Sequence, residues 1–200
     1  WLVLQSKPNP EKRLAMLYYN NPAGKGGIGA SYLNVPGTIR ALLDRLRDEG
    51  YQTGGEAAPD EKTLINLLET SGRNVEVWAP GELDRMVSAR HTVLISMDKY
   101  RRWFAQLPAA FQSSILQHWG PPEKTRLMVI RDRDNQPFFV VPGLRFGNVF
   151  LGPQPLKSSF EEAAKSQHNT AIPPPHAYIA AYLWYRHEFL ADAVIHLGRH

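Results

Sequence analysis

Two short apolar runs near the two ends of the chain predict buried β-strands. Residues 14–19 read Leu-Ala-Met-Leu-Tyr-Tyr, and residues 191–197 read Ala-Asp-Ala-Val-Ile-His-Leu before Gly198 stops the run. Short, nearly continuous apolar runs are typical of parallel strands that are covered on both faces. We therefore expect both segments to be buried strands of one mostly parallel sheet.

Two further stretches predict the helices that cover this sheet. Residues 36–49 carry apolar side chains at helical spacing and end at Gly50, a common helix-terminating residue; the apolar positions are Ile39, Leu42, Leu43 and Leu46. Three prolines at 173–175 suit an extended chain and then the first turn of a helix. Residues 175–189 are apolar almost all round, so we expect this helix to be buried on more than one side.

The middle of the chain predicts a helical insertion and a hairpin. The pattern indicates a helix capped by Asp60 and ending near 69, a helix over 80–89, a possible strand over 91–96, helices within 97–119, hairpin strands at 126–130 and 137–141, and a further strand over 144–150. The expected fold class is α/β: a mostly parallel sheet flanked by helices, with a short antiparallel β-hairpin and a helical insertion at about 60–120. Residues 1–12 are expected to be a connector to the α/β unit of residues 13–200.

Composition and charge narrow the class of protein. The chain has no cysteine, so a disulfide framework and thiolate metal sites are excluded, and His, Asp, Glu, Asn and Gln remain as metal ligands. The net charge of +4 comes from basic residues that are spread out without aromatic interleaving, which argues against a nucleic-acid partner. No run approaches the roughly 20 apolar residues of a membrane span. We expect a soluble, cytoplasmic protein.

Several of the seven histidines lie in the last part of the chain, where metal chemistry is a natural hypothesis. His196 and His200 are four residues apart, which on a helix would place two imidazoles on one face. On a strand that spacing covers about 13 Å, too far for both rings to touch one metal ion. Arg199 and His200 instead follow the predicted last strand, at the sheet edge where open α/β sheets bind ligands.

A glycine-rich loop over residues 20–36 raises the question of nucleotide binding. The segment Gly24-Lys25-Gly26-Gly27 lacks the spacing and the Ser or Thr of a phosphate-binding loop, and it fits the dinucleotide fingerprint poorly. From the residues alone, we expect the loop to be a flexible connector.

Several long segments, in the same order along the chain, resemble the large subunit of cobaltochelatase, the CobN type, in a family that also contains the H subunit of magnesium chelatase. The matching segments are Tyr-Tyr-Asn-Asn-Pro-Ala-Gly-Lys (18–25), Ile-Gly-Ala-Ser-Tyr-Leu-Asn-Val (28–35), Gly-Asn-Val-Phe-Leu-Gly-Pro-Gln-Pro (147–155), His-Asn (168–169), Pro-Pro-Pro-His-Ala-Tyr (173–178), Tyr-Leu-Trp (182–184), Ala-Asp-Ala-Val-Ile-His (191–196) and Gly-Arg-His (198–200). The first and last of these look closer to cobaltochelatase than to magnesium chelatase. Because family members are much longer, we expect this chain to be a piece of a larger polypeptide.

The resemblance implies an ATP-dependent metal chelatase that forms nitrogen–metal bonds in cobalamin or chlorophyll-type biosynthesis. Its substrates would be a tetrapyrrole, such as a corrin or porphyrin, and a divalent metal, cobalt or magnesium. ATP would be used by partner subunits, one an AAA+ ATPase and one a third chelatase subunit. The family's motif continues beyond Gly-Arg-His to a glutamate implicated in insertion, so the isolated piece is expected to be inactive.

The resemblance also implies site residues. His200 is the leading candidate for metal ligand and catalytic proton acceptor, followed as metal ligands by His168 and His176, because neutral imidazole suits both roles. The helix dipole at the first turn should keep His176 neutral. His196 is equally well read as a core histidine. The expected substrate contacts are Asn21, Lys25, Tyr32, Arg145, Asn148, Gln154 and Arg199.

Two other functions stay open at this point. The chain could belong to a haem- or tetrapyrrole-binding protein of the same family that removes metal or lacks ATP-driven insertion, or it could be a generic α/β binding module. Neighbouring genes for ATPase subunits would favour insertion, and failure to bind any porphyrin or corrinoid would leave the generic module.

Overall fold

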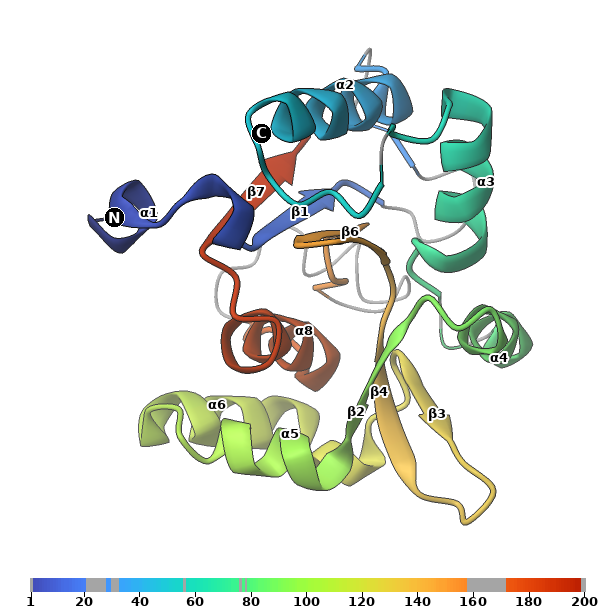
Figure 1. The fold of residues 1–200 in the computed structure, drawn as a ribbon. Helices are drawn as coiled ribbons and strands as arrows, with labels where there is room; N and C mark the ends of the chain where they lie inside the picture. Colours follow the sequence, from blue (N-terminus) through green and yellow to red (C-terminus); the bar gives the residue numbers. More distant parts are fainter. Residues whose placement is uncertain are drawn as a thin grey trace.

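A computed structural model describes residues 2–20, 28–29, 33–55, 57–75, 77, 79–157 and 172–198 of the chain. Its elements form two sheets with helices around them (Figure 1). In chain order they are α1 (Leu2–Ser6), η1 (Asn9–Glu11), β1 (Leu14–Tyr18), α2 (Val35–Asp48), α3 (Glu61–Ser71), α4 (Pro80–Ser88), β2 (Val93–Ser96), α5 (Met97–Phe104), α6 (Ala109–Trp119), η3 (Pro122–Lys124), β3 (Val129–Arg131), β4 (Pro137–Val141), β5 (Leu144–Phe146), β6 (Val149–Pro153), α8 (His176–His187) and β7 (Ala193–Leu197).

The larger sheet has the strand order β5-β6-β1-β7, and it confirms the predicted α/β class. Strands β6 and β7 flank β1 in parallel, and β5 pairs with β6 antiparallel. Strand β1 is buried along its whole length. Because side chains alternate between the faces of a strand, Leu14, Met16 and Tyr18 pack in the cluster that contains α2 and α3 residues. Ala15 and Leu17 pack in the cluster that contains α8 residues.

Helix α8 lies between this sheet and helices α5 and α6 (Figure 1). It buries residues on several sides, as predicted; those with the least exposure are His176, Ile179, Ala180, Ala181, Leu183, Trp184 and Tyr185. Predicted helices 36–49 and 60–69 correspond to α2 and α3, and the Asp60 side chain caps α3 by accepting a hydrogen bond from the Thr63 backbone at 2.8 Å.

The last strand differs from the prediction that it is buried. Residues 193–197 do form a strand parallel to β1, but β7 stands at the edge of the sheet among the described residues. Val194, Ile195 and His196 are exposed, while Ala193 and Leu197 pack against the cluster around α2. The apolar run correctly indicated a parallel strand, but an edge position leaves its middle uncovered.

Two other strand predictions need correction. The predicted strand over 144–150 is two strands, β5 and β6, joined by a turn in which Gly147 has a φ of 55°. Strand β6 then continues through Gly152 and Pro153 instead of ending before them. The first hairpin strand begins at Val129 because Met128 has a φ of 51°, a left-handed conformation that interrupts an extended chain.

The smaller sheet is antiparallel, with strand order β2-β4-β3. Strands β3 and β4 are the predicted hairpin, and β2 pairs with β4 as a third strand. The helices α5 and α6, within the predicted helical stretch 97–119, lie beside α8 (Figure 1). Residues 2–6, predicted as part of a connector, form the short helix α1, and the boundary at residue 12 stays a prediction. Among the described helices, none is both long enough and apolar enough to span a bilayer.

Candidate functional site

Polar groups gather where the parallel strands β1 and β6 end. Tyr18 and Pro153 face each other in register at the carboxyl ends of these strands. The backbone N–H of Gln154 donates to the Tyr18 carbonyl at 2.8 Å, so the pairing continues one residue beyond the strand. In open α/β sheets this is the edge at which ligands bind.

A buried pair of asparagines joins this edge to the segment after α3. The backbone N–H of Asn74 donates to Asn20 Oδ1 at 2.7 Å, and Asn74 Nδ2 donates to the Gln154 carbonyl at 2.9 Å and to the Asn20 carbonyl at 3.3 Å. Both asparagines are at most 2% exposed. Buried amides need such partners. These hydrogen bonds fix the segment after α3 against the residues that follow β1 and β6.

The sequence pattern assigned no role to Asn74 and no separate role to Asn20. Nothing local distinguishes a buried asparagine from a solvated one, since the partners lie 54 and 80 residues apart along the chain. Tyr18 is held in the same way: its hydroxyl donates to the Gly72 carbonyl, and burial raises its pKa well above the ordinary value, with the nearby Tyr185 adding to the rise.

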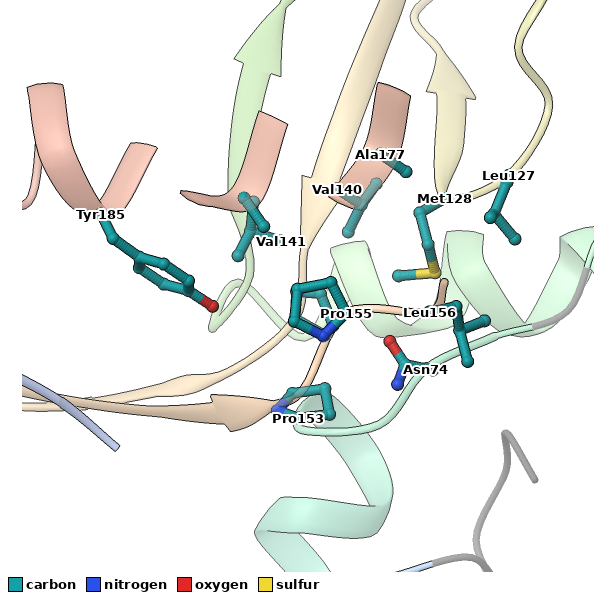
Figure 2. Close-up of a pocket in the computed structure, with 12 residues that line it drawn as sticks. Asn74, Leu127, Met128, Val140, Val141, Pro153, Pro155, Leu156, Ala177 and Tyr185 are labelled. Atoms are coloured by element: carbon teal, nitrogen blue, oxygen red, sulfur yellow. The ribbon is translucent and has the colours of Figure 1, made fainter. Parts of the chain in front are cut away.

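A small cavity adjoins the asparagine pair, between the end of β6, the smaller sheet and α8 (Figure 2). It is a narrow crevice with enclosed room for about one water molecule. Asn74 and Tyr185 are the polar side chains among its described lining residues, and the remaining lining is apolar: Leu127, Met128, Val140, Val141, Pro142, Pro153, Pro155, Leu156, Ala177 and Ala181.

His176 lies at the start of α8 and is fully buried. Its Nδ1 is 2.7 Å from the Tyr100 hydroxyl, and its Nε2 is 2.9 Å from the Gly120 carbonyl. A carbonyl can only accept, so Nε2 carries the hydrogen and Nδ1 accepts from Tyr100. The one lone pair available to a metal is therefore occupied, and metal binding by His176, which stays a prediction, requires Tyr100 to move.

The neutral state expected for His176 has a different main cause from the predicted helix dipole. Burial lowers the pKa of His176, because a charged imidazole loses its hydration there. The hydrogen bond to Gly120 and the carboxylate of Glu123 oppose this shift without reversing it.

The predicted substrate contacts that the structure describes lie at opposite ends of the strands of the larger sheet. Gln154 follows the carboxyl end of β6, whereas Asn148 precedes its amino end and donates from Nδ2 to the Pro10 carbonyl at 3.0 Å. Six residues of extended chain separate the two by about 20 Å. Arg145, on β5, is exposed near the Asn148 edge, where its Nε donates to the Gly147 carbonyl at 2.9 Å. One small ligand cannot contact all three residues.

The other predicted site residues lie outside the described residues; they are Asn21, Lys25, Tyr32, His168, Arg199 and His200. His196 is exposed on β7, so its interpretation as a core histidine is wrong. Within the described ranges, no three His, Asp or Glu side chains are grouped so that they could hold a metal ion.

An open, mostly parallel sheet with helices around it defines a protein of the α/β class. The chain belongs to the CobN/Magnesium Chelatase family, whose family model matches residues 1–200. It is 33% identical over 201 residues to the aerobic cobaltochelatase subunit CobN of Pseudomonas aeruginosa, covering 100% of this chain and 15% of that protein. It is 30% identical over 201 residues to the chloroplastic magnesium-chelatase subunit ChlH of Oryza sativa subsp. japonica, covering 100% of this chain and 13% of that protein.

The fold is similar to a solved structure, that of the catalytic subunit of cobaltochelatase from Mycobacterium tuberculosis. The TM-score is 0.70 with 29% sequence identity, over 99% of this chain and 16% of the other. The chain thus spans about a seventh of the length of the relatives it matches. Family membership therefore rests on the whole of this chain, and on a small part of each relative.

Proposed function

We propose that this chain is part of the large subunit of a metal chelatase, the subunit that holds a tetrapyrrole and a divalent metal, cobalt or magnesium, as substrates. The observation that carries the proposal is the match of all 200 residues to the chelatase family. The proposal includes an AAA+ ATPase and a third subunit as partners, with ATP consumed by the partners. Cobalt is the preferred metal because the Tyr-Tyr-Asn-Asn-Pro and Gly-Arg-His segments resemble the cobalt-type chains more closely.

Metal insertion requires that the ion lose water, that the ring bend, and that two pyrrole N–H protons be accepted. We assign metal binding and proton acceptance to His200, since neutral imidazole suits both. His168 is the second candidate ligand.

Gln154 supports substrate binding at the carboxyl edge. Its backbone N–H and carbonyl are both engaged, with Tyr18 and Asn74, while its side chain is half-buried. Because the backbone of Gln154 is already fixed, a ligand that binds its side chain orders that side chain alone and no further backbone.

Titration of the 200-residue chain with a soluble porphyrin, followed by the Soret absorbance and by tryptophan fluorescence, tests substrate binding. Gln154→Ala should weaken the affinity about fivefold, the loss of one hydrogen bond. Asn148→Ala is the matched control, because it removes an amide from the opposite edge of the same strand, and it should leave the affinity unchanged. Absence of binding to any porphyrin or corrinoid, or equal effects of the two variants, would contradict the proposal.

The reaction is tested in a polypeptide of the relatives' length together with its ATPase partners. His200→Ala should abolish most metal insertion and leave macrocycle affinity nearly unchanged, because a ligand or proton acceptor acts on the reaction more than on substrate binding. The 200-residue chain alone should hydrolyse no ATP. Normal insertion by the His200→Ala variant would remove this residue from the reaction, and porphyrin binding with no insertion in the full assembly would favour a binding or metal-removing protein.

A further inference from the structure

Asn74 links the chain segments that follow two neighbouring parallel strands. Its Nδ2 donates to the Gln154 carbonyl at 2.9 Å and to the Asn20 carbonyl at 3.3 Å, and its backbone N–H donates to Asn20 Oδ1 at 2.7 Å. Gln154 directly follows β6, and Asn20 lies just beyond β1. Asn74 belongs to neither strand, and it is 1% exposed. A buried donor outside the larger sheet therefore connects the carboxyl ends of β1 and β6.

The segment that carries Asn74 is fixed by hydrogen bonds to other parts of the fold. The Tyr18 hydroxyl donates to the Gly72 carbonyl, and the Gly143 N–H donates to the Ser71 carbonyl at 2.9 Å. Both donors belong to the framework of the two sheets, since Tyr18 ends β1 and Gly143 lies between β4 and β5. The Asn74 amide is therefore presented from a fixed position.

The hydrogen bond from Asn74 holds the second of the two peptide groups of Gln154. The first is held by its own N–H, which donates to the Tyr18 carbonyl at 2.8 Å. The second joins Gln154 to Pro155 and has no N–H, so its carbonyl is the one group through which a hydrogen bond can hold it. Asn74 binds that carbonyl, and Figure 2 shows Asn74 beside Pro153 and Pro155, the prolines on either side of Gln154. With both peptide groups held, the direction in which the Gln154 side chain leaves the backbone is fixed as well.

We propose that Asn74 is a positioning residue for substrate binding at the carboxyl edge, because it holds the Gln154 backbone so that the Gln154 side chain meets the ligand in one direction. The inference rests on the proposed function, in which Gln154 contacts the tetrapyrrole. Among the described residues, no hydrogen bond engages the Gln154 side chain, so its amide is available to a ligand. The Asn74 amide nitrogen is buried and used by two carbonyls, so Asn74 acts through Gln154.

A double-mutant cycle tests this role, with the affinity of the 200-residue chain for a soluble porphyrin followed by the Soret absorbance. Asn74→Leu keeps the shape of the side chain and removes its donor, so it should weaken the affinity about three- to fivefold, up to the effect of losing the Gln154 contact itself. In the Gln154→Ala background the same change should weaken the affinity less than about 1.5-fold, because no side chain remains to be positioned. A residue that only stabilises the fold would weaken the affinity equally in both backgrounds.

Asn66→Leu is the matched control. It makes the same substitution at an exposed position on α3, and it should leave the affinity unchanged. Circular dichroism checks that each variant is folded. If Asn74→Leu folds poorly, Asn74→Asp takes its place with the same expected results, because a carboxylate has no hydrogen to donate to the two carbonyls.

Amide hydrogen exchange, followed by NMR, gives a measurement that needs no ligand. Asn74→Leu should speed the exchange of the Gln154 N–H by about tenfold or more, because the carbonyl on the other side of this residue is released. Asn66→Leu should leave that exchange rate unchanged.

The outcomes separate this role from the proposed function. An unchanged affinity of Asn74→Leu, or an equal loss in both backgrounds, would overturn the positioning role and leave substrate binding by the chain intact. Unchanged exchange of the Gln154 N–H would overturn the coupling on which the role depends. Absence of porphyrin binding to the parent chain would contradict the proposed function, and the positioning role would fail with it.

Discussion

His176 shows at the scale of one residue how packing decides the chemistry available to a side chain. Its position in the first helical turn suggested a neutral ring free to bind a metal. The fold instead places the ring between Tyr100 and Gly120, in an edge-to-face contact with Phe104. The ring is neutral chiefly because it is buried, and both nitrogens already join α8 to the helical part of the chain.

His176→Ala should lower the free energy of unfolding by about 3 kcal/mol, because it leaves two buried polar partners unpaired and opens a cavity. Urea denaturation measures this. His118→Ala, at an exposed position on α6, is the control and should change stability by less than about 0.5 kcal/mol.

The contribution of His176 should also depend on pH. Its folded pKa is depressed, so the unfolded chain binds a proton that the folded chain does not, and stability is full above the ordinary pKa of about 6.5. Stability is lost as the pH falls from there through the folded pKa. The difference between the parent and His176→Ala chains should therefore shrink below pH 6.5, and a difference that is constant from pH 8 to 5 would contradict a neutral buried ring.

At the scale of elements, the turn between β5 and β6 requires a glycine at position 147, because any other residue there would be strained and crowded. Gly147 has a φ of 55°, and a Cβ there would lie 2.6 Å from both the Gln52 carbonyl oxygen and the Gly54 nitrogen. Gly50 has a φ of 82°, but a Cβ at that position would meet no atom within 4 Å. Both positions carry backbone strain for other residues, and only the first adds a backbone clash.

Gly147→Ala should cost about 3 kcal/mol of stability, the sum of the strain and of local displacement. Gly50→Ala should cost about 1 kcal/mol, since it carries the strain alone. Thermal and urea unfolding measure the loss of stability in each variant, and the difference between the two losses gives the cost of the clash at Gly147. Equal losses would show that the backbone near Gly54 can move aside at no cost in free energy.

At the scale of the whole molecule, α8 packs in one apolar cluster with residues of both sheets. Phe150 of β6 contacts Trp184 and Phe189, with ring centroids 4.9 Å and 5.9 Å away. The same cluster contains Tyr100 of α5 and Phe139 of β4 in the smaller sheet. Removing the Phe150 ring should therefore weaken the packing of both sheets.

Phe150→Ala should lower stability by about 4 kcal/mol, and secondary structure and tryptophan fluorescence should still be lost in one coincident transition. Phe111→Ala, at a position that is 37% exposed on α6, is the control and should have a small effect. Two separate transitions for the parent chain would show that the sheets unfold independently.

Much of the fold could be predicted because its signals are local. Apolar runs indicated β1 and β7, helical spacing indicated α2, and the near-complete apolar surface of 175–189 indicated a helix buried on several sides. The turn at Gly147 was missed because a glycine in an apolar run does not reveal a positive φ. The strand order was not accessible at all, since neighbours such as β1 and β6 are separated by most of the chain.

The sequence alone determined the α/β class, most of the elements and the family, because periodicity and ordered motifs are properties of the chain itself. Only the tertiary structure decided that β7 is an edge strand, that Asn148 and Gln154 lie at opposite edges, and that Asn20 pairs with Asn74. It also decided that the Tyr185 hydroxyl faces a cavity without a partner among the described residues. The physical reason is common to all of these: burial and hydrogen-bond partners are set by contacts between residues that are distant in the chain.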